Sequence, residues 1–327
     1  MRDMVYQGTV WGPPLWNVFY ADARTSIEHC GFEDIVYADD LNAFKVVPAH
    51  MSDVDAFAAQ RWCQETLHTW GRANSVTFDA SKESAHIVAR TRPVGDNFTI
   101  LGVEFDCKLV MGVAVHKCAV ECGWRLLTLV RTRRFHTDAE LLMLFETHLV
   151  SYIEHRTPAF AHASSSVLAE VDAVQERFLR TIGVTEEDAL HHFRLAPLPV
   201  HRDIAMLGLV HRCVLGRGPA IFRAFFCVDT APTPARCPRR HGRHLCDPCG
   251  LRWPDYALRS ALGAARLYNL LPDFVVAASS VSLFQRRLQE LVRARARHCD
   301  DWRTTLSWRV PLWSHPLRLC RDWTDGR

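Results

Sequence analysis

Hydrophobic and polar residues follow two different spacings near the start of the chain. Residues 32–47, FEDIVYADDLNAFKVV, contain two runs rich in Val, Ile, Phe and Tyr on either side of Ala38, Asp39 and Asp40. Such runs predict β-strands, and the short segment between them predicts a β-hairpin with acidic residues at its tip. Residues 51–72 instead carry apolar side chains near helical spacing, so we expect an amphipathic helix there.

Glycine and proline residues mark the segment before the hairpin. We interpret residues 7–14 as a loop, and we expect a helix over residues 15–29 with Pro14 near its first turn. Residues 76–90 and 98–106 have the composition of strands joined by polar turns. The first third of the chain therefore predicts an α+β unit.

From Val113 onward the spacing of apolar residues is helical. A proline- and arginine-rich stretch over residues 229–254 predicts a linker or a small loop-rich module. The helix after this stretch is expected to be capped by a serine between Ser279 and Ser282. The other helices that we expect cover residues 114–134, 138–155, 165–183 and 202–215.

The composition is that of an intracellular globular protein. The chain has 327 residues, of which 48% are hydrophobic, and this suffices for the cores of two or three domains. Its 12 cysteines are scattered through apolar stretches, which favours reduced thiols. We see no secretion signal and no apolar run of roughly 18 residues, so we expect the nucleus or the cytoplasm and no membrane partner. The net charge of +3 comes mainly from arginine, which suits phosphate binding but also reflects GC-rich genomes.

Two adjacent carboxylates, Asp39 and Asp40, occupy the tip of the expected hairpin. Like charges this close repel each other unless a cation lies between them and another group. Hard divalent ions prefer such oxygen ligands, and two-metal phosphoryl-transfer sites use paired acids to hold the attacking and leaving oxygens. The alternative is that Asp-Asp is ordinary turn chemistry.

Two sequence blocks in this order resemble the reverse transcriptases of non-LTR, LINE-type retrotransposons. That family carries a Q-G-x-x-x-G-P-x-L-W/F-N block followed by a Y/F-A-D-D hairpin. The residues that match the first block are Gln7, Gly8, Gly12, Pro13, Leu15, Trp16 and Asn17. The residues that match the hairpin are Tyr37, Ala38, Asp39 and Asp40. Further along, FDASKES is similar to the family's N-x-x-K-T/S block, and FTILGVEFD is similar to its primer-grip hairpin.

The resemblance implies template-primed DNA synthesis, with an RNA template and a DNA primer as partners and Mg²⁺ or Mn²⁺ as cofactor. Asp39 and Asp40 are the implied metal-binding catalytic residues, and Lys82 is a further catalytic residue. The residues implied to bind the template and the nucleotide are Gln7, Gly8, Gly12, Pro13 and Tyr37. The implied primer grip is formed by Leu101 and Gly102. No protein partner is indicated.

The helical part of the chain resembles the thumb of these enzymes, where basic residues follow the phosphates of the primer duplex. The residues implied to make such contacts are Lys117, Arg125, Arg131, Arg133 and Arg134. Alternatively, these cations are favoured simply because they lie towards the C-terminus of a helix.

The likeness covers most of the chain and is weakest over residues 220–260 and after residue 300. It implies a partial polymerase palm over residues 1–110 and a helical thumb-like domain over residues 111–190. A mostly helical C-terminal region over 191–300, with a Cys/His-rich loop at 237–249, precedes a Trp-rich tail at 301–327 that can be disordered.

In the family, the fingers and the first catalytic aspartate come before the glycine block, whereas six residues precede Gln7 here. We therefore expect an N-terminally truncated reverse transcriptase that has no polymerase activity by itself. The alternatives are a non-catalytic module that binds nucleic acid or zinc, and a remnant without a selected function.

The Cys/His-rich loop, CPRRHGRHLCDPC, carries soft donors at zinc-like spacing. Cys246 and Cys249 form a plausible knuckle, and Cys237 or His241 would complete the ligand set. Against zinc, a second knuckle at the familiar spacing is absent, and a cysteine-rich background produces such clusters by chance. Both readings stay open at this point.

Overall fold

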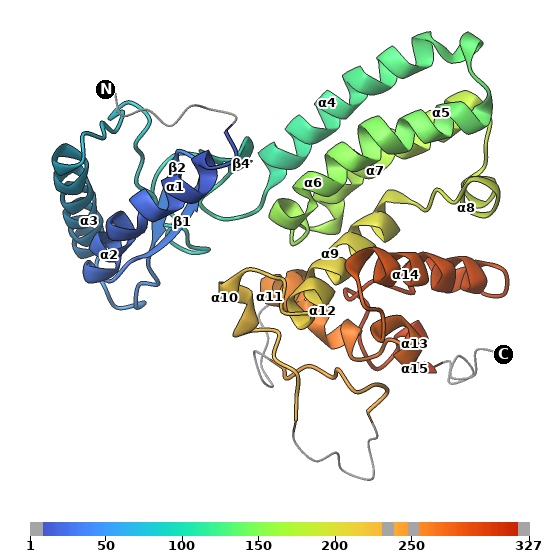
Figure 1. The fold of residues 1–327 in the computed structure, drawn as a ribbon. Helices are drawn as coiled ribbons and strands as arrows, with labels where there is room; N and C mark the ends of the chain where they lie inside the picture. The colour runs from blue at the N-terminus through green and yellow to red at the C-terminus, as the bar shows by residue number, and fades with distance from the viewer. Residues whose placement is uncertain (1–8, 231–238, 248–254, 320–327) are drawn as a thin grey trace. The chain divides into compact units, whose positions relative to one another are not determined.

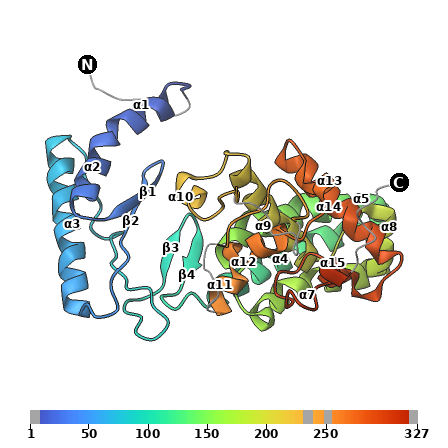
Figure 2. The same cartoon turned by 90° about the horizontal axis from the view of Figure 1, so that it is seen from below.

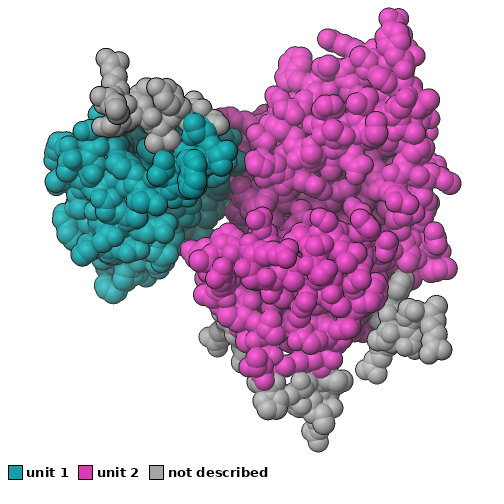
Figure 3. Space-filling model, in the orientation of Figure 1, with its two compact units in different colours: residues 1–109 teal, residues 110–327 magenta. Residues whose placement is uncertain are grey.

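The computed structural model describes residues 9–230, 239–247 and 255–319 and is mostly helical. The strands of the described residues form two antiparallel sheets of two strands each. The chain divides into two compact units, residues 1–109 and residues 110–327, which Figure 3 shows in different colours. The expected α+β class is confirmed, while the more specific assignment to a polymerase palm stays a prediction.

The first unit holds both sheets (Figures 1 and 2). Helix α2 packs against strand β1 on one side and against the long helix α3. In chain order the elements of this unit are α1 Gly12–Phe19, α2 Ala21–His29, β1 Glu33–Tyr37, β2 Asp40–Phe44, α3 Asp53–Ala73, β3 Phe98–Ile100 and β4 Val103–Phe105. The helix expected over residues 51–72 is confirmed as α3, which begins after a serine cap at Ser52.

The hairpin expected around the two aspartates is confirmed. Strands β1 and β2 pair antiparallel, with Tyr37 opposite Asp40, so Ala38 and Asp39 form a two-residue turn. Ala38 has a φ of 54°, and a positive φ at the first turn position is the backbone conformation of a type II′ hairpin turn.

The expected loop over residues 7–14 is wrong in its last three residues. Helix α1 already begins at Gly12, and prolines fill the following positions of its first turn. A proline fits there because its fixed φ is helical and its missing N–H has no partner in a first turn.

The single helix expected over residues 15–29 is divided at Tyr20. The ψ of Tyr20 is −5°, which bends the chain between α1 and α2. At this bend the Tyr20 ring packs against Trp70 of α3, with ring centroids 5.3 Å apart. The spacing of apolar residues does not reveal that the helix is interrupted at Tyr20, where the ring packs on a residue from a distant part of the chain.

The strand expected over residues 76–90 does not form. Among the described residues, this segment forms one isolated antiparallel bridge, between Ile87 and Val94. Near its start, the Asp79 carboxylate accepts hydrogen bonds from the backbone N–H and the hydroxyl of Ser81, at 3.0 and 2.6 Å. Such local side-chain bonds stabilise a turn and compete with the ladder of a strand. By contrast, residues 98–105 form the expected hairpin, β3–β4.

The second unit is a helical assembly in which α4 packs on α7, and α9 packs on α12 and α14 (Figures 1 and 2). Its first elements are α4 Gly112–Arg131, η1 Arg133–Phe135, α5 Asp138–Phe145, η2 Glu146–Val150, α6 Ser151–Phe160, α7 Ser165–Ile182, α8 Glu186–Phe193, α9 Leu198–Val214 and α10 Ala220–Arg223. After a gap in the described residues follow α11 Asp255–Arg259, α12 Ala261–Tyr268, α13 Asp273–Val276, α14 Val281–Ala296, η3 Asp300–Thr304 and α15 Pro316–Leu319. The expected helices are confirmed, and Ser280 caps α14.

The core of the second unit extends into the segment that we expected to be a Trp-rich tail. Its buried residues run from Ala161 to Leu317 and include Trp302 and Trp308. Trp313, by contrast, is exposed. The described part of this segment, up to residue 319, therefore contributes to the core.

A membrane-crossing helix is not found among the described residues, because none of their helices combines sufficient length with sufficient hydrophobicity.

Candidate active site

The tip of the β1–β2 hairpin presents its acidic residues to solvent. Asp39 in the turn and Asp40 at the start of β2 are both exposed, and so is Tyr37 on the other strand. Neither carboxylate forms an ion pair with another described residue under a 4 Å limit. The two carboxylates are thus accessible to a cation.

The glycine block and the acidic hairpin meet in space through one hydrogen bond. The indole Nε1–H of Trp16 in α1 donates to the backbone carbonyl of Ala38 at 2.6 Å, across 22 positions of sequence. The carbonyl of Ala38 precedes the amide of Asp39, so this bond fixes the peptide that carries the first acid. Trp16 in turn packs on the Tyr20 ring, with centroids 4.8 Å apart.

Tyr20 connects the hairpin tip to the core of the first unit. Its side chain is buried together with Trp70, and partly buried Val36 and Leu41 of the hairpin pack on this cluster. Burial raises the pKa of the Tyr20 hydroxyl, and the negative charge of Asp39 raises it further. The hydroxyl therefore stays protonated beside the acid and adds no second negative charge there.

A third metal ligand does not join the two aspartates within the described part of the chain. No group of three or more His, Cys, Asp or Glu side chains there is placed to hold a metal ion. The oxygen donors of Asp39 and Asp40 suit Mg²⁺, which commonly takes one or two carboxylates and completes its shell with water and substrate phosphates. The residues present therefore fit part of a magnesium site.

Several residues implied by the family resemblance make no hydrogen bond or ion pair with this tip among those that the described residues form. Lys82 is exposed, and its ammonium nitrogen lies 3.9 Å from Asp79. Leu101 and Gly102 form the turn of the β3–β4 hairpin, where both have positive φ, at 49° and 77°. Because β3–β4 is a separate sheet, these residues do not share a sheet with the acids.

The glycine block is described only in part. Gln7 and Gly8 lie outside the described residues. Gly12 and Pro13 form the first turn of α1.

The basic residues of the thumb-like region differ in their availability. Arg125 is half-buried, donates from Nε to Glu121 at 2.9 Å, and stacks its guanidinium 3.9 Å from the centroid of the Tyr152 ring. Arg133 donates to the carbonyl of Thr181 at 3.4 Å. These two arginines therefore have internal roles, which the sequence pattern did not reveal.

Exposed apolar residues accompany the remaining cations on α4. Val120, Trp124 and Leu127 are exposed, and the Trp124 side chain reaches 64% exposure. Helical spacing places these residues along the same stripe as Lys117 and Arg131. Sequence reasoning missed this stripe, although apolar residues on two faces of one helix were a visible signal for it. Arg134, exposed just beyond the helix, stacks on Phe135.

The zinc hypothesis rests on residues that are only partly described. Cys237 and Cys249 lie outside the described residues. His241 is buried, and its Nε2–H donates to the carbonyl of Tyr268 at 3.0 Å. Its Nδ1 is buried without a hydrogen-bond partner among the described residues, so this nitrogen keeps a free lone pair. Cys246 is exposed. The zinc site stays a prediction.

Comparisons of the chain with protein-family models, with curated proteins and with solved structures gave no match.

Proposed function

We propose that this chain is the palm and thumb portion of an RNA-directed DNA polymerase, the reverse transcriptase of a non-LTR retrotransposon. The observation that carries the proposal is the hydrogen bond from Trp16 to the carbonyl of Ala38. It joins the two sequence blocks on which the resemblance rests, and it does so at the peptide that precedes Asp39.

The proposed chemistry is phosphoryl transfer with bound magnesium. Asp39 and Asp40 would hold the metal, which supplies charge stabilisation for the attacking and leaving oxygens. The remaining residues act by positioning: Trp16 fixes the turn, and Tyr20 stays protonated beside Asp39. A rigid hairpin matters because a misplacement of about 1 Å costs on the order of a hundredfold in rate.

The proposed duplex-binding surface is the exposed stripe of α4 with Lys117 and Arg131, extended by Arg134. Arginine and lysine neutralise backbone phosphates without reading sequence. Trp124 and Leu127 give the stripe an apolar surface that can lie against sugars. This surface is independent of the acidic tip, so nucleic-acid binding does not require catalysis.

We propose that the chain is inactive without a further carboxylate. Two-metal catalysis needs ligands beyond Asp39 and Asp40, and the described residues bring no third acid to them. A fingers segment from a related enzyme, with its own aspartate, should supply that ligand.

The test is primer extension on an RNA template in the presence of magnesium. The chain alone should give no extension, and a fusion to a related fingers segment placed upstream of Gln7 should give some. Asp39→Asn should abolish extension by the fusion, whereas Glu33→Gln, an exposed acid on the same hairpin, should leave it unchanged. Extension by the unfused chain that is lost in Asp39→Asn would contradict the claim of inactivity.

A second candidate function is nucleic-acid binding without catalysis, and the exposed stripe of α4 favours it. Under that alternative the fusion binds a primer–template duplex but never extends the primer, and Asp39→Asn has no effect on either measurement.

A further inference from the structure

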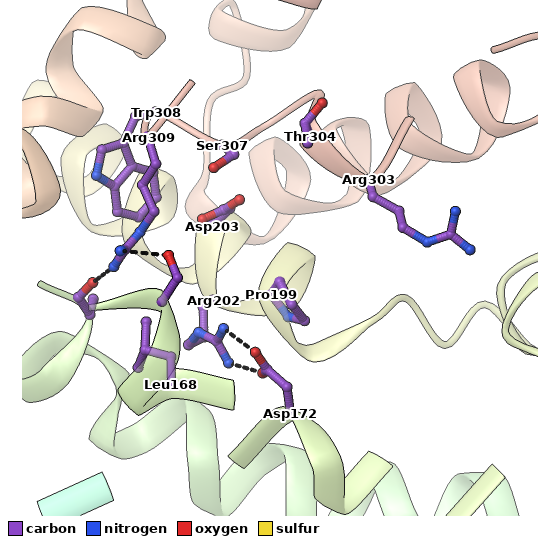
Figure 4. Close-up of a pocket in the computed structure, with 12 residues that line it drawn as sticks. Leu168, Asp172, Pro199, Arg202, Asp203, Arg303, Thr304, Ser307, Trp308 and Arg309 are labelled. Carbon is purple, nitrogen blue, oxygen red and sulfur yellow. Dashed lines mark hydrogen bonds and ion pairs between the residues drawn. The ribbon is translucent and has the colours of Figure 1, made fainter. Parts of the chain in front are cut away.

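A pocket of about 260 Å³ lies inside the second unit. Helices α7 and α9 form one wall, and the end of η3 with the segment that follows it forms the other (Figure 4). The wall combines two aspartates, three arginines and one tryptophan. The residues that matter for its chemistry are Asp172, Arg202, Asp203, Arg303, Trp308 and Arg309.

Asp203 is a buried acid that faces this pocket without a partner. The residue is 7% exposed, and its carboxyl group makes no hydrogen bond or ion pair with any residue that the structure describes. In Figure 4 the carboxyl lies on the side of Ser307, away from the Arg202–Asp172 pair. A buried polar group without a partner is costly, and a ligand with suitable donors would remove that cost.

The arginines near Asp203 are engaged with other groups. Arg202 forms a two-pronged ion pair with Asp172, with Nη2 at 2.9 Å from Oδ2. Arg309 donates to the backbone carbonyls of Ala161 and Ala163, the latter at 2.9 Å. These contacts hold the wall rigid but leave the Asp203 carboxyl unsatisfied.

Arg303 offers a cation at the edge of the pocket. Its side chain is 49% exposed, and Nε donates to Glu186, while its two terminal nitrogens have no hydrogen-bond partner among the described residues. Glu186 balances the charge of Arg303, as Asp172 balances that of Arg202, but the terminal nitrogens of Arg303 remain available as donors. These donors at the edge of the pocket can accept an anionic group of a ligand.

Trp308 lines the pocket with the part of its indole that the core leaves uncovered, and 7% of the residue is exposed. Its Nε1–H donates to the carbonyl of Arg259 at 3.2 Å, which fixes the orientation of the ring. A planar heterocycle gains stacking energy on such a surface, and base–aromatic stacking is worth about 1–3 kcal/mol per base.

We propose that this pocket binds a guanine nucleotide, with the base against Trp308, its N1–H and N2 amino group donating to the Asp203 carboxylate, and its phosphate near Arg303. Among the common bases, guanine alone presents two adjacent donors that match both oxygens of one carboxylate. Free guanine nucleotides and unpaired guanines in nucleic acid share this chemistry. The site is separate from Asp39 and Asp40, and its test does not depend on polymerase activity.

The environment of Asp203 gives the binding a pH dependence. Burial raises the pKa of this carboxyl to about 8, although Arg202 and Arg309 act in the opposite direction and Asp172 adds to the rise. Guanine binding needs the ionised form, so affinity should increase as the pH rises from 6 toward about 8. Asp172 and the three arginines of the wall are the charged groups around this carboxyl.

The test is isothermal titration of the full chain with GMP in EDTA, which removes metal from Asp39 and Asp40. We expect saturable binding of GMP that is about tenfold or more tighter than that of AMP, CMP or UMP. IMP, which lacks the N2 amino group, should bind more weakly than GMP. A short RNA with one unpaired guanine, compared with the same RNA carrying adenine, distinguishes a nucleic-acid source from a free nucleotide.

Asp203→Asn is the sharpest variant because the amide keeps the shape but replaces one acceptor by a donor. It should weaken GMP about tenfold or more and strengthen XMP, whose C2 carbonyl accepts from the new amide. Glu290→Gln, an exposed acid on α14, should change neither affinity. The proposal is overturned if neither GMP nor the guanine RNA binds at up to about 1 mM, or if Asp203→Asn leaves the preference for GMP over the other nucleotides unchanged.

If Asp203→Asn does not fold, the comparison of GMP with IMP on the unmodified chain decides. Equal affinities for these two nucleotides would overturn the proposal as well.

Discussion

At the scale of single residues, the second unit depends on a buried histidine that is held neutral. Nε2–H of His211 donates to the carbonyl of Ala278 at 3.1 Å, and Nδ1 accepts from the Tyr268 hydroxyl at 2.8 Å. The ring is fully buried and stacks on Phe284. Burial lowers the pKa of His211 to about 4. As the pH falls, the unfolded chain therefore binds a proton on this imidazole before the folded chain does. The contribution of His211 to the free energy of unfolding is therefore present above pH 6.5 and lost as the pH falls toward 4.

Tyr268→Phe should expose the importance of this arrangement. The change removes the donor to Nδ1 and leaves a buried acceptor unsatisfied, which costs about 1–3 kcal/mol of the free energy of unfolding. Urea unfolding followed by hydrogen exchange in peptides from α9 and α12 measures the loss in the second unit. Tyr37→Phe, on the exposed hairpin, should have almost no effect on these peptides. Equal effects of the two changes would show that the hydroxyl of Tyr268 is not used.

At the scale of elements, the contact of α1 with the β1–β2 hairpin determines how firmly the acidic tip is held. The tip has one short turn, in which Ala38 adopts a left-handed conformation that costs an alanine roughly 1 kcal/mol. The hydrogen bond from Trp16 supports that conformation from outside the hairpin. A hairpin of two strands has marginal stability by itself, so such external support matters.

Trp16→Phe should loosen the tip while the helix persists. The ring still packs on Tyr20, but the donor to Ala38 is lost, at a cost of about 1 kcal/mol. Hydrogen exchange of the β1–β2 amides should become several-fold faster. Trp62→Phe, an exposed position on α3, provides the control and should leave the exchange unchanged. Unaltered exchange in Trp16→Phe would contradict a supporting role for the indole.

At the scale of the whole molecule, salt dependence distinguishes a built phosphate-binding surface from general attraction by arginine. Replacing Arg131 and Arg134 by Gln should reduce the slope of log affinity against log salt by roughly 2 for an RNA–DNA duplex. Replacing Arg286 of α14 and Arg297 just after that helix by Gln removes the same charge from exposed positions and should leave the slope unchanged. Binding is measured by fluorescence anisotropy on the full chain over a range of salt concentrations. Equal slopes for both double variants would favour attraction by net charge alone.

Local patterns in the sequence determined most of the elements. The runs rich in Val, Ile, Phe and Tyr on either side of Asp39 predicted β1 and β2 with their turn. Helical spacing predicted α3 and the main helices of the second unit, because such patterns depend on neighbours a few positions apart. The strand expected at residues 76–90 failed because the Asp79 side chain satisfies nearby backbone and hydroxyl donors, which the apolar pattern does not register.

Only the tertiary structure showed which residues that are distant in the sequence come into contact. The sequence by itself named Asp39, Asp40 and Trp16 as motif positions, but only the fold showed that the indole of Trp16 reaches the turn carbonyl 22 positions away. The pocket around Asp203 gave no sequence signal, because its wall joins residues from α7, α9, η3 and the segment after η3. Side chains become buried and find hydrogen-bond partners only when distant segments pack. The raised pKa of Asp203 and the hydrogen bond of Arg125 are therefore properties of the folded chain.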